Sequence, residues 1–107
     1  MVRINSLPAP FKAKKVQDQL EKVCQDNDVL LLALFGSFAQ GRPTSKSDVD
    51  LLVKFNHSAE KSLLDLIRTE REMKRVFKRK VDLVTMEGLS PYFRKDVLKT
   101  MRIIYER

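Results

Sequence analysis

Two aspartates at alternate positions of an apolar segment are the residues of this sequence best suited to chemistry. Asp48 and Asp50 begin a stretch that runs to Phe55 and is otherwise mostly apolar. Because side chains alternate across a β-strand, a strand here puts both carboxylates on one face, with Cα atoms about 6 to 7 Å apart. An unpaired buried charge costs several kcal/mol, so we expect a bound divalent cation to compensate the pair.

A third aspartate repeats this arrangement in a second strand-like segment, because Asp82 lies between two apolar residues of the segment 80–85. If the two strands are neighbours, Asp48, Asp50 and Asp82 can hold two Mg²⁺ ions. Such ions prefer oxygen ligands and, when about 3.5 to 4 Å apart, clamp a phosphoryl centre. We therefore predict these three residues as metal ligands and catalytic residues. The alternative is a surface role, in which Asp48 and Asp50 meet solvent at a strand end and Asp82 pairs with Lys80.

A glycine–serine pair ends the longest unbroken apolar run. Gly36 and Ser37 directly follow the run Val29–Phe35. A glycine at such a turn lets a substrate approach the backbone, and the N–H groups of a short helix over 37–40 would point at an anion. We predict that Gly36 and Ser37 bind the β- and γ-phosphates of a nucleoside triphosphate. Taken alone, the pair is equally typical of an ordinary turn.

Hydrophobic periodicity predicts the elements that must position these residues. The unbroken apolar run is typical of a strand covered on both faces, and the alternation after it puts Val49, Leu51, Val53 and Phe55 on the core side of the next strand. We expect a loose tail over 1–9, helices over 11–25, 58–77 and 90–100, and strands over 29–35, 48–55, 80–85 and 103–105. The 107 residues have room for one domain, 1–107, and predict an α+β fold with a small mixed β-sheet flanked by helices.

Composition restricts the partners and the location. The net charge of +7 indicates anionic partners such as nucleotides, nucleic acid or an acidic protein. We interpret the basic run over 74–80 as a solvated helix end rather than a nucleic-acid surface, because cations stabilise a helix C-terminus and the run has a single aromatic residue. The apolar runs are far shorter than the ~18 residues of a membrane span, and the N-terminus lacks the apolar core of a secretory signal. We therefore expect a cytoplasmic protein without membrane contact.

The combined motif resembles a known family. Gly36-Ser37, ten residues, then Asp48-Val49-Asp50 is similar to the GS-x10-DxD signature of the DNA polymerase β-like nucleotidyltransferase superfamily. Three segments resemble its minimal nucleotidyltransferase (MNT) branch. They are GSFAQG…SDVDLLV, the later KVDLV segment with Asp82 and the closing LSPYFRKDVLKTMRIIYER. The resemblance implies a polymerase β-like fold, Mg²⁺-dependent transfer of a nucleoside monophosphate from ATP, and catalytic carboxylates at the three predicted aspartates.

The resemblance also implies a partner. Minimal nucleotidyltransferases often act as antitoxins paired with a helical HEPN ribonuclease toxin, whose tyrosine they adenylylate. The present chain departs from the family pattern at Gln40, where many relatives have arginine. We expect Arg42 to supply the corresponding contact to the phosphates of the nucleotide.

The leading hypothesis is a protein adenylyltransferase that moves AMP from ATP to a hydroxyl group of a HEPN-type toxin, with Asp82 helping to deprotonate that hydroxyl. After the sheet and helices are counted, no residues remain for an acceptor-binding domain, so a partner chain or a second copy must hold the acceptor. One alternative directs the same chemistry at a small molecule or an RNA end. The other is a non-catalytic binding module that caps a toxin sterically.

Overall fold

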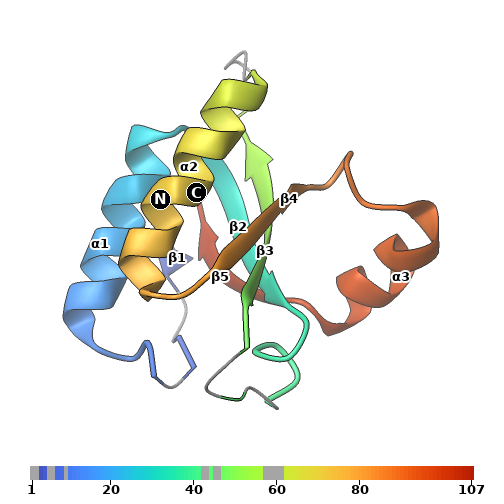
Figure 1. Cartoon of the computed structure of the whole chain (residues 1–107), viewed down its shortest axis with the longest axis horizontal. Coiled ribbons are helices and arrows are strands. Elements are labelled where there is room, and N and C mark those ends of the chain that lie inside the picture. Colours follow the sequence, from blue (N-terminus) through green and yellow to red (C-terminus); the bar gives the residue numbers. More distant parts are fainter. Residues whose placement is uncertain (1–2, 5–6, 9, 42–43, 45–46, 57–61) are drawn as a thin grey trace.

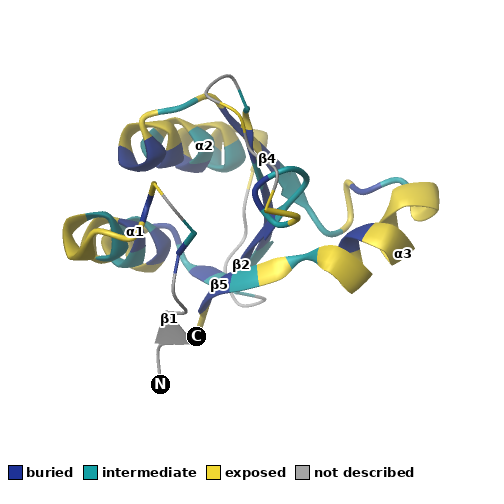
Figure 2. Cartoon of the chain, turned by 90° about the horizontal axis from the view of Figure 1, so that it is seen from below, coloured by how far each residue is buried: buried dark blue, intermediate teal, exposed yellow. Residues whose placement is uncertain are grey.

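The computed structural model describes residues 3–4, 7–8, 10–41, 44, 47–56 and 62–107. These residues form the elements β1 (Arg3–Ile4), α1 (Lys14–Asp26), β2 (Val29–Phe35), β3 (Val49–Phe55), α2 (Leu63–Phe77), β4 (Val81–Thr85), α3 (Pro91–Thr100) and β5 (Arg102–Glu106). The strands make one sheet in the order β1-β5-β2-β3-β4. α1 and α2 lie side by side on one face of the sheet and α3 lies on the other (Figures 1 and 2). No helix in these ranges is long and apolar enough to cross a membrane.

The sheet is mixed, as predicted. β3 and β4 are parallel, whereas β2 is antiparallel to both of its neighbours and β1 is antiparallel to β5. Parallel neighbours need a crossover connection, and α2 provides it. In the register of this pair, Asp50 of β3 lies directly opposite Asp82 of β4. The predicted α+β fold is therefore confirmed, and its one described parallel pairing joins the two strands that carry these aspartates.

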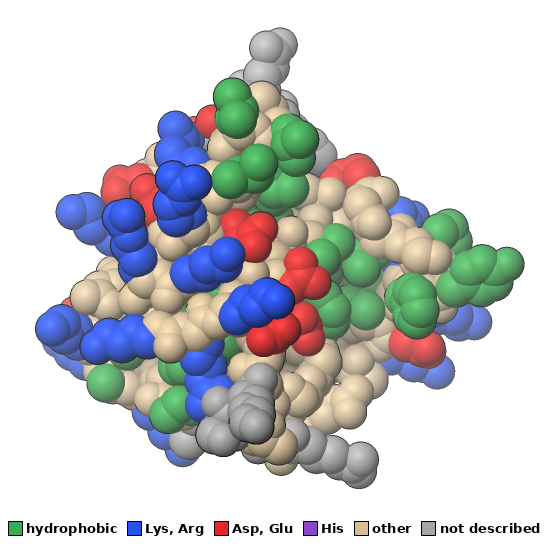
Figure 3. Space-filling view, in the orientation of Figure 1, with side chains coloured by type: hydrophobic (Ala, Val, Ile, Leu, Met, Phe, Trp, Pro, Cys, Tyr) green, Lys and Arg blue, Asp and Glu red, His purple; other side chains and the backbone are tan. Residues whose placement is uncertain are grey.

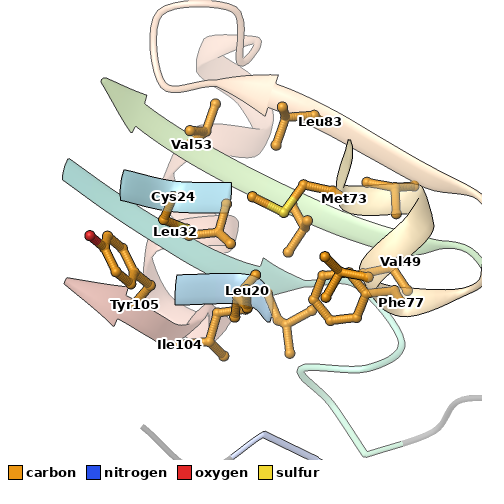
Figure 4. Packing of buried hydrophobic residues seen from close by; sticks show 14 of the residues in the cluster. Leu20, Cys24, Leu32, Val49, Val53, Met73, Phe77, Leu83, Ile104 and Tyr105 are labelled. Carbon is orange, nitrogen blue, oxygen red and sulfur yellow. The ribbon is translucent and has the colours of Figure 1, made fainter. Parts of the chain in front are cut away.

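The main core lies between the sheet and the two helices α1 and α2 (Figure 4). Val49, Leu51 and Val53 of β3 are fully buried in it, and Phe55 packs against it while partly exposed. Other buried members from both helices and from the sheet are Leu20, Cys24, Leu32, Met73, Phe77, Ile104 and Tyr105. The predicted inward face of β3 is thus confirmed, and this core fixes the strand that carries Asp50.

The opposite face of the sheet is only partly covered. Leu52 packs there in a second, smaller cluster with Ala33 of β2, with Leu89 before α3 and with Val97 of α3. Figure 2 shows the buried residues of α1 and α2 turned toward the sheet, whereas most of α3 is exposed. Because side chains alternate, Asp50 lies on the same face as Leu52, beside the part that α3 covers. The carboxylate is therefore placed at the border between an apolar patch and solvent.

The prediction of a loose tail over 1–9 is wrong for the described part of that segment. Arg3 and Ile4 pair with Glu106 and Tyr105 of β5, and Leu7 is fully buried. A strand of two residues has too little alternation to be recognised from sequence, and its partner strand lies at the other end of the chain. The start of the chain therefore closes the edge of the sheet beside β5.

The helices begin later than predicted, for identifiable reasons. α1 begins at Lys14, and Phe11, the predicted start of this helix, instead packs its ring against Phe38 and Phe77, at centroid distances of 5.3 and 4.8 Å. α2 begins after Ser62, whose hydroxyl accepts from the backbone N–H of Asp65 while the carboxylate of Asp65 accepts from the backbone N–H of Ser62.

The predicted start of α2 at residue 58 falls within 57–61, outside the described residues. α3 begins at Pro91 after the capping residue Ser90, as predicted.

Replacing Leu7 tests whether the N-terminal segment belongs to the fold. Leu7→Ala removes a fully buried side chain, so we expect it to lower the free energy of unfolding by about 2–4 kcal/mol. The matched control is Leu64→Ala, where the side chain is 77% exposed and the loss should stay within about 0.5 kcal/mol. Urea denaturation measures both. Equal, small losses for the two variants would show that the segment is loose after all.

Candidate active site

The three predicted aspartates come together at the N-terminal ends of β3 and β4. Asp48 immediately precedes β3, and Asp50 and Asp82 are paired across the two parallel strands. Neighbouring strands are about 4.8 Å apart, so the two paired carboxylates leave the sheet close to each other. Asp50 is half-buried, whereas Asp48 and Asp82 are exposed. Figure 3 shows acidic side chains gathered near the middle of this face.

The electrostatics at Asp50 reflect this crowding. Burial, followed by the negative charges of Asp82 and Asp48, raises the pKa of the Asp50 carboxyl above its ordinary value. Both effects disfavour the ionised form, because a carboxylate loses hydration when buried and is repelled by like charges. A cation between the three carboxylates would instead favour the ionised form of Asp50. The free protein therefore holds an unfavourable charge where the sequence predicts a metal.

The donor set fits Mg²⁺. Three carboxylates offer only oxygen atoms, and Mg²⁺ is commonly held by one or two carboxylates that substrate phosphates and water supplement. In the described ranges no three acidic, cysteine or histidine side chains lie together as a group that could hold a metal ion by itself. Metal binding by Asp48, Asp50 and Asp82 stays a prediction.

Gly36 is required by its contact with Asp50. Its φ of +71° lies in the left-handed region that favours glycine. A Cβ atom built on Gly36 would collide with Oδ2 of Asp50, and the neighbouring Phe35 is the β-sheet partner of Asp50. The glycine therefore lets the end of β2 come close to the carboxylate, which gives it a role beyond forming a turn.

Ser37 lies in the turn that follows, half-buried. The predicted short helix over 37–40 is wrong: one bond from the N–H of Gln40 to the carbonyl of Gly36, 3.1 Å long, closes a turn that does not continue. Glycine at both 36 and 41 in the left-handed region explains why no helix propagates. Phosphate binding by Gly36 and Ser37 stays a prediction, without the help of a helix dipole. Arg42, the predicted third phosphate ligand, lies outside the described residues.

Arg79 is a site residue that sequence reasoning missed. Its Nη1 donates to the carbonyl oxygens of Thr44 and Ser47, at 3.0 and 3.2 Å. Its guanidinium carbon lies 5.3 Å from the ring centroid of Phe38, a cation–π arrangement. Arg79 thus joins the start of β4 to the glycine turn and to the residues just before Asp48. The interpretation of the basic run as a solvated helix end is wrong for this half-buried side chain.

A cleft of about 340 Å³ opens beside the carboxylates. Gly36, Gln40 and Asp82 form one side of it, and Phe93 and Thr100 of α3 form part of the other. In Figure 3 hydrophobic side chains adjoin the acidic group on this face. Asp82 therefore faces a space that is large enough for part of a nucleotide or for an acceptor side chain.

Comparison with known proteins agrees with this geometry. A family model described as "Nucleotidyltransferase domain" matches residues 16–104. A relative from Methanocaldococcus jannaschii, named "Putative protein adenylyltransferase", is 30% identical over 86 residues, which make up 78% of the present chain and 86% of the relative. The family match spans Asp48, Asp50 and Asp82.

Solved structures share the fold. A structure described as a "putative minimal nucleotidyltransferase" is 30% identical, with a TM-score of 0.69 over 82% of this chain and 88% of that one. A chain of a toxin-antitoxin complex with AMP-PNP has a TM-score of 0.70 at 22% identity, covering 85% of this chain and 73% of that one. A complex of tri-AMPylated Shewanella oneidensis HEPN toxin with MNT antitoxin has a TM-score of 0.63 at 18% identity, covering 88% and 72%. The last two likenesses show the fold alone.

Substitution of Gly36 separates its contact with Asp50 from its backbone conformation. Gly36→Ala and Gly41→Ala both place alanine at a positive φ, +71° and +72°, which costs about 1–2 kcal/mol in each case. Only Gly36→Ala also drives a methyl group into Asp50, since nothing lies within 4 Å of a Cβ at Gly41. We expect Gly36→Ala to lose at least about 1 kcal/mol more in urea denaturation. Equal losses would contradict the contact.

Removing the charge of Asp50 should stabilise the ligand-free protein. A raised pKa means that the folded state binds the proton more tightly than the unfolded chain, so stability falls as the pH rises from the unfolded pKa through the folded pKa. Asp50→Asn removes this loss. Without divalent cations, it should melt at a higher temperature than wild type at about pH 7, and the difference should shrink towards about pH 4.

The control for that comparison is Asp18→Asn, which removes the same charge from an exposed position of α1. It should leave the melting temperature nearly unchanged across the same pH range. A melting temperature for Asp50→Asn below that of wild type at neutral pH would contradict the proposed repulsion at the site.

Proposed function

Since this chain belongs to the nucleotidyltransferase domain family, we propose that it transfers AMP from ATP, with Mg²⁺, to a hydroxyl group of a partner protein. The observation that carries the proposal is the pairing of Asp50 with Asp82 across parallel strands, beside the close approach of Gly36. A carboxylate group next to a tight glycine turn suits a triphosphate held through a divalent ion. The relative named as a protein adenylyltransferase supports a protein as the acceptor.

The chemistry assigns a role to each residue. Gly36 and Ser37 contact the β- and γ-phosphates, while Asp48, Asp50 and Asp82 hold Mg²⁺. When bound, Mg²⁺ neutralises charge on the triphosphate and on the departing pyrophosphate. The acceptor oxygen forms a bond to the α-phosphorus as the bond from that phosphorus to the pyrophosphate oxygen breaks. Asp82, which is exposed and faces the cleft, receives the proton of the acceptor hydroxyl.

The far wall of the cleft supports a protein acceptor. α3 exposes Tyr92, Phe93 and Leu98, at 89%, 64% and 42% of their surfaces, and Phe93 also lines the cleft. Large apolar side chains exposed together are typical of surfaces that contact another protein. A partner resting on α3 would bring a hydroxyl-bearing side chain next to Asp82. We propose a HEPN-type toxin as this partner, in keeping with the toxin-antitoxin complexes among the structural neighbours.

Transfer of label from α-³²P-ATP tests the proposal. The purified chain is incubated with Mg²⁺ and the product of the adjacent reading frame, and labelled protein is separated on a denaturing gel. We expect wild type to label that product and Asp48→Asn/Asp50→Asn to reduce the initial rate more than about 100-fold. Asp18→Asn/Asp26→Asn is the matched control, because it removes two exposed aspartates from α1 and should keep the wild-type rate.

Two outcomes would overturn the proposal. Label that appears only on added RNA or on a small molecule would move the acceptor to a different class while leaving the chemistry intact. Tight complex formation without label from any nucleoside triphosphate would indicate a binding module that acts sterically.

A further inference from the structure

A second cavity, of about 450 Å³, lies between the start of α1 and the end of α2. Apart from Gln19, its polar lining is basic: Lys15 comes from α1, and Arg75, Lys78 and Arg79 come from the end of α2 and the residues after it. We call this the basic groove. It shares no lining residue with the cleft beside the carboxylates, so it is a separate feature of the surface.

Three cations of the basic groove, Lys15, Arg75 and Lys78, have no opposite charge paired with them in the described part of the chain. In the described part of the chain the ion pairs are those of Arg68 with Asp65 and of Lys74 with Glu70, both outside the groove. Lys15, Arg75 and Lys78 are exposed and form no ion pair with any described residue. Like charges that face one cavity repel each other, and a bound anion would remove that repulsion.

Two of these residues depart from the locally favoured choice, Lys78 by its backbone conformation and Lys15 by its charge. Lys78 ends α2 in the left-handed conformation, with φ of +54°, at a position where glycine is favoured. Lys15 lies in the first turn of α1, which contains no acidic residue, so its charge opposes the helix dipole. Residues that break local rules in this way are typical of functional sites. The backbone of Lys78 and the charge of Lys15 therefore favour a ligand-binding role for this cluster over that of an ordinary charged surface.

We propose that the basic groove binds the phosphodiester backbone of a double-stranded nucleic acid. The exposed side chains of Lys15, Arg75 and Lys78 give affinity for phosphates regardless of base sequence. The aromatic residues of the lining, Phe11 and Phe77, are only 4% and 3% exposed, so they cannot stack on unpaired bases. A duplex, whose bases are already stacked, presents the phosphates alone. This proposal does not depend on the proposed transferase reaction.

Three cations of the run 74–80 line the basic groove together with one from a distant helix. Sequence shows that cations cluster after Met73, but it does not show that Lys15 of a distant helix joins them across a cavity. In the structure the end of α2 and the start of α1 line one cavity, so cations lie on both of its sides. That arrangement, rather than the run itself, carries the proposal.

Fluorescence anisotropy with labelled duplexes of about 20 base pairs, one of RNA and one of DNA, tests it at about 50 mM salt. The groove variant Lys15→Gln/Arg75→Gln/Lys78→Gln should bind at least about tenfold more weakly than wild type. Its salt dependence should be shallower by about one unit per lost phosphate contact. Arg79 is left intact because it holds the residues before Asp48. Binding of either duplex supports the proposal, and the tighter one identifies the source.

The matched control is Lys22→Gln/Lys95→Gln/Lys99→Gln, which removes three charges from exposed positions outside the groove. It should weaken binding less than about threefold. Equal weakening by the two triple variants would overturn the proposal, because the affinity would then follow net charge alone. So would undetectable binding by wild type, or equally tight binding of poly-glutamate, which would assign the groove to an acidic protein.

A single substitution gives an independent check. Lys78→Gly relieves the left-handed backbone, so it should raise the melting temperature. It also removes one cation, so it should weaken duplex binding about two- to threefold. A more stable protein that binds less well cannot be explained by misfolding. Unchanged binding by Lys78→Gly, together with unchanged binding by the groove variant, would overturn the proposal.

Discussion

Electrostatic repulsion between Asp50 and Asp82 is the constraint to which the surrounding structure responds. The parallel pairing of β3 with β4 sets these residues opposite each other, and Asp48 adds a third negative charge. Nothing in their immediate strands offsets that repulsion. The two strands are held in register instead by apolar side chains on the other face, where Val49, Leu51 and Val53 are buried under α1 and α2 (Figure 4). The core thus stabilises a strand pairing that the charges of Asp48, Asp50 and Asp82 oppose. Such opposition is typical of catalytic sites.

Three segments distant in the sequence meet at this arrangement, and two residues hold them. Gly36 lets the end of β2 approach Asp50 where any side chain would collide. Arg79 donates to the carbonyl oxygens of Thr44 and Ser47 and covers the ring of Phe38. Its position just before β4 means that the same residue fixes the start of the strand carrying Asp82 and the approach to Asp48. The proposed reaction requires a triphosphate and a metal in one geometry, and these contacts would pre-organise the protein side of it.

Local and alternating patterns explain what the sequence could predict. Alternation in β3 placed Val49 and Leu51 in the core and Asp50 on the opposite face, because that pattern depends only on neighbours along the strand. The start of α3 followed from Ser90 and Pro91, whose preferences are local as well. The proximity of Asp82 to Asp50 needed one further step, the parallel crossover, and the family resemblance supported it.

Contacts between distant segments explain what the sequence could not predict. β1 exists only because β5, at the other end of the chain, offers it an open edge. Arg79 looked like one more cation of a basic helix end until the fold placed carbonyl oxygens within its reach. The basic groove likewise needs Lys15 and Lys78 to face the same cavity from different helices. Such features depend on packing, for which a single sequence carries little signal.

Calorimetric titration of a non-hydrolysable ATP analogue, with and without Mg²⁺, tests the central claim that the three aspartates form one metal-dependent nucleotide site. We expect Asp48→Asn, Asp50→Asn and Asp82→Asn each to weaken binding in Mg²⁺ by more than about tenfold, and none to weaken it when Mg²⁺ is absent. Asp18→Asn should bind as wild type does. Equal affinity of wild type and all three site variants in Mg²⁺ would contradict the account, because the carboxylates would then be neighbours without a shared ligand.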